Sequence, residues 1–196
     1  MAEKKMTVRP ESDALLVVDV QNDFCPGGAL AVPEGNAVVP VINTLLARGT
    51  WRLTVATRDW HPADHCSFRT QGGTWPPHCI AGTRGAEFHP DLDRTRIQEV
   101  VSKATSREKD AYSGFEETEL LSLLTGHGVT RAVVTGLATD YCVRATALDA
   151  RKVGLAVLVV TDAVRAVEVK PGDGEKALAE MKAAGITLVF SKALIG

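Results

Sequence analysis

Residues 131–160 open with Arg131-Ala-Val-Val-Thr135 and close with Leu155-Ala-Val-Leu-Val-Val160. Each of these is a short apolar run of strand length. The segment between them is predicted to form a helix from about Asp140 to Arg151. A strand, a helix and a second strand in this order form a right-handed βαβ unit, in which the two strands lie parallel.

The same alternation extends toward both ends of the chain. Further strands are predicted at 14–18, 51–56, 99–102 and 186–190, and further helices at 36–48, 116–124 and 174–184. This order predicts an α/β fold: a doubly wound, mostly parallel six-stranded sheet with helices on both faces. With 196 residues and no linker, we expect one domain over 1–196.

Composition excludes several classes of protein. The chain is 45% hydrophobic and 23% charged, which is typical of a globular domain and not of a disordered chain. Its 22 basic and 24 acidic residues give a net charge of −2, so no basic excess is available to bind nucleic acid. No run approaches the roughly 18 apolar residues of a membrane helix, and we expect no membrane association.

The cysteines indicate a reducing compartment. They stand at 25, 66, 79 and 142, and no two form a Cys-x-x-Cys pair. A chain long enough to bury a core does not depend on disulfides, so we expect free thiols. The N-terminal residues contain no apolar segment typical of a secretory signal. These observations predict a cytoplasmic protein.

Chemically active side chains follow the predicted strands. In an open parallel sheet, ligands bind outside the carboxyl ends of the strands. In chain order, the residues after the first five strands are Asp19; Asp59 with His61; Lys103; Cys142; and Thr161 with Asp162. The sequence therefore predicts a reactive site at this edge, whereas a nucleotide site is disfavoured because no glycine-rich phosphate motif is present.

Cys142 is the candidate nucleophile. It falls in the first turn of a predicted helix, where backbone N–H groups and the helix dipole favour a thiolate. A nearby Lys103 ammonium would lower the pKa of the thiol further, and Asp19 could accept its proton. The alternative, a small buried hydrophobic residue, carries equal weight on spacing alone.

A histidine cluster forms the second candidate site. The irregular segment 57–97 contains His61, His65, His78 and His89, and Asp59 lies two residues before His61. On an extended stretch, residues i and i+2 face the same side. Two imidazoles and a carboxylate suit zinc, iron or manganese, so Asp59, His61 and His78 are the candidate ligands. His65 is a further candidate ligand or a supporting residue, and surface histidines are the alternative.

Five motifs, taken together, carry a family resemblance. They are Val17-Val-Asp-Val-Gln-Asn-Asp-Phe-Cys25, Thr57-Arg-Asp-Trp-His-Pro-Ala-Asp-His65, Trp75-Pro-Pro-His-Cys79, Gly82-Thr-x-Gly-Ala-Glu87 and Gly136-Leu-Ala-Thr-Asp-Tyr-Cys-Val143. In this order the chain resembles the nicotinamidases (pyrazinamidases) among the isochorismatase-like cysteine hydrolases. The resemblance implies hydrolysis of nicotinamide to nicotinate and ammonia, in NAD salvage, with one divalent metal ion.

The resemblance also implies roles for individual residues. It implies a catalytic triad of Asp19, Lys103 and Cys142. It implies metal ligands Asp59, His61 and His78, with His65 nearby. A cis peptide bond between Leu137 and Ala138 would aim the N–H groups of Ala138 and Cys142 at an oxyanion. Residues implied to line the substrate pocket are Phe24, Leu30, Trp75 and Tyr141.

Two other classes of function stay open on the sequence. One is a related hydrolase acting on another small amide, although many such relatives lack the metal motif. The other is a non-catalytic binding protein, which would not need an acid, a lysine and a cysteine after three separate strands. The expected partner is a small molecule, nicotinamide; the oligomeric state is left open, with a homo-oligomer kept as an option.

Overall fold

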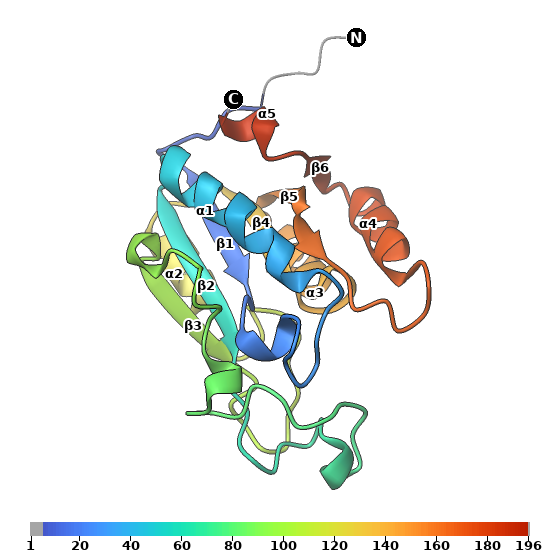
Figure 1. Ribbon diagram of the computed structural model, residues 1–196. Helices are drawn as coiled ribbons and strands as arrows, with labels where there is room; N and C mark the ends of the chain where they lie inside the picture. Colours follow the sequence, from blue (N-terminus) through green and yellow to red (C-terminus); the bar gives the residue numbers. More distant parts are fainter. Residues whose placement is uncertain (1–5, 196) are drawn as a thin grey trace.

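The computed structural model describes residues 6–195. Within them, six strands form one sheet in the order β3-β2-β1-β4-β5-β6, with every pair parallel. The strands are β1 (Asp13–Val18), β2 (Leu53–Asp59), β3 (Glu99–Lys103), β4 (Arg131–Leu137), β5 (Ala156–Arg165) and β6 (Thr187–Val189) (Figure 1). The prediction of a doubly wound α/β fold is confirmed.

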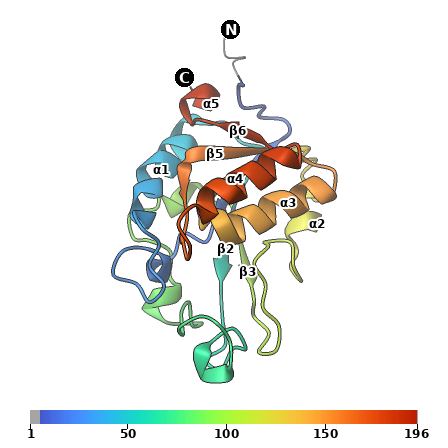
Figure 2. The ribbon, with the colours of Figure 1, turned by 90° about the vertical axis from the view of Figure 1, so that its right-hand side faces the viewer.

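Helices cover both faces of the sheet, as Figure 2 shows. Helix α1 (Val38–Arg48) and the short α5 (Lys192–Ile195) contribute to the core on one face. The other face is covered by α2 (Leu120–Gly126), α3 (Arg144–Lys152) and α4 (Asp173–Ala183). No helix within residues 6–195 has the length and apolar character needed to cross a bilayer.

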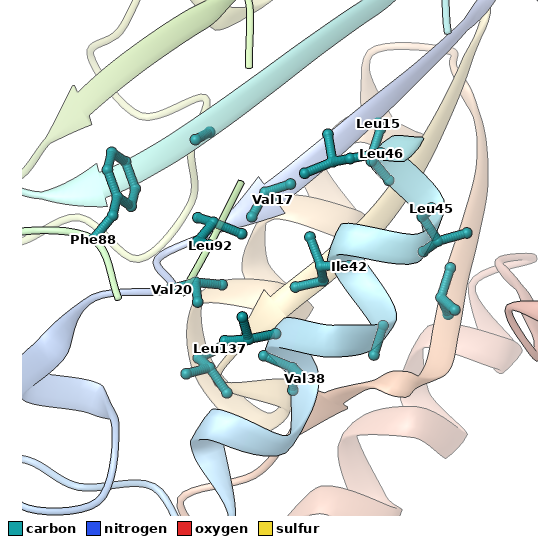
Figure 3. Close-up of a cluster of buried hydrophobic side chains, with 14 of the residues drawn as sticks. Leu15, Val17, Val20, Val38, Ile42, Leu45, Leu46, Phe88, Leu92 and Leu137 are labelled. Atoms are coloured by element: carbon teal, nitrogen blue, oxygen red, sulfur yellow. The ribbon is translucent and has the colours of Figure 1, made fainter. Parts of the chain in front are cut away.

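Strand β1 supplies side chains to both cores because successive residues of a strand point to opposite faces. Leu15 and Val17 pack with Ile42 of α1 (Figure 3), whereas Leu16 and Val18 belong to the cluster under α2, α3 and α4. All six residues of β1 are buried. A strand covered on both faces reads as a continuous apolar run, which is why the sequence locates it so well.

Strand β5 continues beyond the predicted end at Val160. After an irregularity opposite Gly136, Val164 and Arg165 still pair with β4. Thr161 and Asp162 therefore lie inside the strand and do not follow it. Asp162 accepts hydrogen bonds from the N–H and hydroxyl of Ser191, at 2.8 and 2.6 Å, so it ties β5 to the chain after β6. The expectation that Asp162 contributes to the reactive edge is wrong.

The helices predicted to begin at Glu116 and at about Asp140 have different starts in the structure. Helix α2 begins at Leu120 and not at Glu116. The helix predicted from Asp140 opens as one π-helical turn, Thr139–Val143, before α3.

The carboxyl ends of the strands meet at a topological switch point. Strand β1 lies between β2 and β4, and the strand order reverses there. Chain connections diverge at such a point and leave a crevice where ligands bind. Much of the chain between β2 and β3 lies below these strand ends in Figure 1.

Candidate active site

Three predicted triad residues meet at the ends of β1, β3 and β4. The ammonium of Lys103 lies 3.0 Å from Oδ2 of Asp19 and 3.4 Å from Sγ of Cys142. It also hydrogen-bonds Oδ1 of Asp59 and the carbonyl oxygen of Ala111. All of these residues are buried: Lys103 is 1% exposed, Asp19 0% and Cys142 5%.

Asp19 is aimed at the crevice by the backbone just after β1. Its φ of 48° is in the left-handed region, which non-glycine residues seldom adopt and which is enriched at functional sites. Its N–H donates to the carbonyl of Thr57, and its Oδ1 accepts from the Thr57 hydroxyl at 2.6 Å. Burial raises the pKa of Asp19, and Lys103 opposes this effect. The Thr57 contacts therefore fix the position of the carboxylate.

The thiol of Cys142 differs from the expectation in its pKa. Burial raises that pKa well above its ordinary value, and the attraction of Lys103 does not compensate. The carboxylates of Asp19 and Asp59 raise it further. The expectation of a lowered thiol pKa is therefore wrong, because it counted the lysine and the helix but not the burial. A neutral thiol next to Asp19 needs that carboxylate as its proton acceptor.

Asp59, His61 and His78 bring their ligand atoms within 4.8 Å of one another. Oδ2 of Asp59 lies 3.5 Å from Nε2 of His61 and 4.0 Å from Nε2 of His78. Nδ1 of His61 lies 3.3 Å from the carbonyl of Ala104, and Nδ1 of His78 lies 2.8 Å from that of Pro76. When Nδ1 donates to a carbonyl, the lone pair is left on Nε2, and the Nε2 atoms face each other across the site.

This group fits a divalent cation. Nε2 of His61 is buried and has no hydrogen-bond partner within the described residues. A buried polar atom without a partner is costly, and a metal ion would satisfy it. Burial lowers the pKa of His78, so its ring is neutral, which is the form that binds metals. Two imidazoles and one carboxylate match the ligand preferences of zinc and of iron.

His65 lies beside this group but outside it. The centroid of its ring lies 4.2 Å from that of His61, with the two rings tilted by 36°. Nδ1 contacts the Ser67 hydroxyl at 2.7 Å, and Nε2 is 2.9 Å from the carbonyl of Lys109. Both ring nitrogens of His65 therefore have protein partners within residues 6–195.

One pocket joins the two groups. It is lined by Cys142 and by Asp59, His61 and His78. Its remaining walls are mostly apolar and aromatic, and they include all four predicted substrate residues: Phe24, Leu30, Trp75 and Tyr141. Ala138 also lines it, and the peptide bond between Leu137 and Ala138 is cis, as the resemblance implied.

Residues 13–192 match the isochorismatase domain family. The chain belongs to the isochorismatase family. Within this family, it is 42% identical to the nicotinamidase of Escherichia coli strain K12, in an alignment covering 89% of this chain and 93% of the relative.

Two solved structures are also similar to this isochorismatase-family chain. PnC1 from L. infantum in complex with nicotinate has a TM-score of 0.93 and 41% identity, covering 97% of this chain and 98% of that protein. The pyrazinamidase of Pyrococcus horikoshii in complex with zinc has a TM-score of 0.84 and 51% identity, covering 91% and 99%.

The isochorismatase-family pocket contains residues that the sequence analysis missed. Asp110, Ala111, Tyr112 and Val167 all line it. The indole N–H of Trp75 donates to the hydroxyl of Tyr112 at 3.0 Å, which fixes the Trp75 ring. Burial raises the pKa of Tyr112 to about 12, so its hydroxyl stays neutral. A signal was available: the chain has two tyrosines, and Tyr112, like Tyr141, follows a predicted strand within about ten residues.

Gln21 was also missed, although it holds a predicted metal ligand. Its side-chain amide donates to the carbonyl oxygens of Asp59 and Ala86 and accepts from the N–H of Asp59. The residue is completely buried. A buried amide with three hydrogen bonds to backbone is a positioning device, and it fixes Asp59 between the two groups of the site. Only its place within the quoted motif around Asp19 pointed to it.

Proposed function

We propose that this protein is a nicotinamidase, which converts nicotinamide and water to nicotinate and ammonia, with pyrazinamide as a second substrate. The observation that carries the proposal is that Cys142 and the candidate metal ligands line one aromatic pocket. A nucleophile alone is compatible with many amidases. A nucleophile that shares its pocket with a metal site is suited to an amide substrate that carries, apart from the amide group, an atom able to coordinate the metal. The activities named for the similar proteins support the same substrate, and the product would enter NAD salvage.

The first half of the reaction forms a thioester. Asp19 accepts the thiol proton of Cys142, and Sγ attacks the carboxamide carbon. The N–H groups of Ala138 and Cys142 would stabilise the negative oxygen of the tetrahedral intermediate. Asp19 then gives its proton to the leaving nitrogen, which departs as ammonia. Lys103 keeps Asp19 and Cys142 in register and offsets negative charge as the thiolate develops.

The second half releases nicotinate. A water molecule attacks the thioester carbon, Asp19 takes one of its protons, and Sγ of Cys142 leaves and is reprotonated. A divalent ion held by Asp59, His61 and His78, such as zinc, iron or manganese, would supply a Lewis acid for the pyridine nitrogen and for water. Phe24 and Trp75 would stack on the ring, which adds about 1 kcal/mol beyond burial.

Ammonia release from three amides tests the proposal. We expect the purified, metal-loaded enzyme to hydrolyse nicotinamide and pyrazinamide, and to hydrolyse benzamide at least about a hundred-fold more slowly, because a site built for a polar partner discriminates against analogues that lack it. Benzamide keeps the ring and the carboxamide and lacks only the ring nitrogen, so it is the matched control. Equal rates for all three amides would show that the metal does not contribute to substrate recognition. No turnover of nicotinamide would favour a different small amide as the substrate.

Location and assembly extend this proposal. We infer a cytoplasmic enzyme, because its four cysteines are free thiols. A homo-oligomer is a further option, which light scattering coupled to size exclusion would test.

A further inference from the structure

The loop between β5 and α4, residues 166–172, is joined to the turn that carries Cys142. In Figure 1 this loop leaves the lower end of β5 and returns to α4. The join is made by Asp140, which is 5% exposed and lies two residues before the nucleophile. One carboxylate oxygen accepts from the N–H of Val167 at 2.9 Å, and the other accepts from the N–H of Glu168 at 3.0 Å.

Val167 is the loop residue that lines the active-site pocket. It also packs against the apolar cluster that contains Phe24 and Ala138. Its side chain therefore forms a wall of the space that the substrate ring would occupy. The position of this wall depends on where the backbone of residue 167 is held.

The rest of the loop is closed on itself. The carboxylate of Glu168 accepts from the N–H groups of Gly172 and Gly174, at 2.6 and 3.0 Å. The carboxylate of Asp173 accepts from the N–H of Lys170 at 2.9 Å. These internal hydrogen bonds hold the loop in one conformation. The two hydrogen bonds from Asp140 therefore set how far the whole loop lies from Cys142.

A helix cap is the ordinary role of an aspartate at the start of a helix. The structure does not support that role, because both oxygens bind a segment 27 and 28 residues away. Within residues 6–195, the Asp140 carboxylate makes no hydrogen bond or ion pair with Asp19, Lys103 or Cys142. Its carboxylate binds instead the backbone of the pocket-lining residue Val167.

We propose that Asp140 is a positioning residue, which holds Val167 against the substrate ring and thereby limits the ring substituents that the pocket accepts. The inference rests on the proposed amidase function, since it assigns a specificity device to that same site. Ring amides without bulky substituents are the favoured class. We call the two hydrogen bonds from Asp140 to the backbone of Val167 and Glu168 the tether. Breaking the tether should weaken binding of the unsubstituted ring and allow rings with larger substituents to bind.

The test compares Asp140→Asn, Val167→Ala and the double variant with the wild type. Asparagine offers one acceptor oxygen and turns its NH₂ toward the second N–H, so the tether is broken on one side. We expect Asp140→Asn to raise KM for nicotinamide about ten-fold with kcat changed less than about three-fold, since it removes binding and not chemistry. In the Val167→Ala background, the same substitution should change KM by less than about two-fold, because coupled residues are not additive.

Two further readouts separate positioning from a general structural role. The preference for ring-methylated nicotinamides over nicotinamide should rise about ten-fold in both single variants, which is the size expected for one methyl group in an apolar pocket. The rate at which iodoacetamide alkylates Cys142 should stay at the wild-type value. Asp162→Asn is the matched control: it also removes a carboxylate bonded to a loop, at Ser191, and should leave KM and substrate preference unchanged.

Several results would overturn the proposal. A fall in kcat with slower alkylation and unchanged KM would show that Asp140 acts by positioning the turn that carries Cys142, and not by positioning Val167. Additive effects in the double variant would uncouple Asp140 from Val167. If Asp140→Asn does not fold, Asp140→Glu replaces it, and unchanged KM in both Asp140→Glu and Val167→Ala overturns the idea. Wild-type turnover of nicotinamide tests the proposed function alone, and the ratios of variant to wild type test the tether.

Discussion

Lys103 and Asp59 stand opposite each other at the ends of β3 and β2, and their hydrogen bond joins the predicted triad to the predicted metal site. Oδ1 of Asp59 accepts from the Lys103 ammonium, while Oδ2 faces His61 and His78. Burial raises the pKa of Asp59, but Lys103 and His61 outweigh it and hold the pKa below its usual range. The ionised Asp59 carboxylate thus contacts both the predicted triad and the predicted metal site. A substitution in either one should therefore alter the other.

Replacing Lys103 by methionine should therefore damage stability as well as activity. The variant would leave two buried carboxylates, Asp19 and Asp59, without their shared cation. We expect the free energy of unfolding to fall by about 3–5 kcal/mol, as when one member of a buried pair is removed, and turnover to fall at least about a thousand-fold. Chemical denaturation and ammonia release measure the two effects.

The double variant Lys103→Met/Asp19→Asn checks the reason given. Removing one of the two carboxylates should restore part of the lost stability without restoring activity. A single Lys103→Met variant as stable as the wild type would show that the carboxylates do not depend on this ammonium.

Replacing Cys142 by alanine should abolish turnover while the fold and the bound metal are kept. The thiol is the predicted nucleophile, and removing it leaves no atom to form the thioester. We expect a loss of at least about a thousand-fold, with unchanged circular dichroism and metal content. In the wild type, acid quench and mass spectrometry should detect nicotinoyl thioester on Cys142. Activity near the wild-type level in the alanine variant would rule out covalent catalysis.

His61→Ala and His78→Ala should each lose bound metal with the fold retained, because the sheet supplies its own core. The sharper comparison is with His65→Ala, whose ring nitrogens contact Ser67 and Lys109. That variant should keep most of its metal and lower the melting temperature. Metal analysis of the purified proteins, with thermal unfolding, measures both. Full metal content in His78→Ala would exclude that ligand, and loss confined to His65→Ala would indicate a different ligand set.

Gly136→Ala should be among the most destabilising single substitutions. Gly136 has φ of 107°, and an added Cβ would lie 2.0 Å from the carbonyl oxygen of Val18. We expect a loss of more than about 4 kcal/mol or a failure to fold. Gly126→Ala is the matched control: its Cβ would meet nothing within 4 Å, so it should be neutral or stabilise α2 by up to about 1 kcal/mol. Urea denaturation compares them.

The sequence alone was sufficient to predict the fold class and the reactive side chains at the strand ends. Buried parallel strands such as β1 are continuous apolar runs, so their positions and the residues after them can be read locally. Asp59 and His61 share one side of an extended stretch for the same local reason. Asp19, Lys103 and Cys142 could be predicted to reach one edge, because parallel strands end on the same side of a sheet.

Strand order, burial and distant contacts were decided only by the tertiary structure. That β1 lies between β2 and β4 places Asp19 beside Lys103 and Cys142, and no local pattern specifies that order. The pKa of Cys142 was predicted with the wrong sign, because local rules counted the helix and the lysine while burial came from elements far along the chain. The tether from Asp140 to Val167 spans 27 residues. Periodicity records which residues face the interior, but the partner that each one meets there is set by how the whole chain packs.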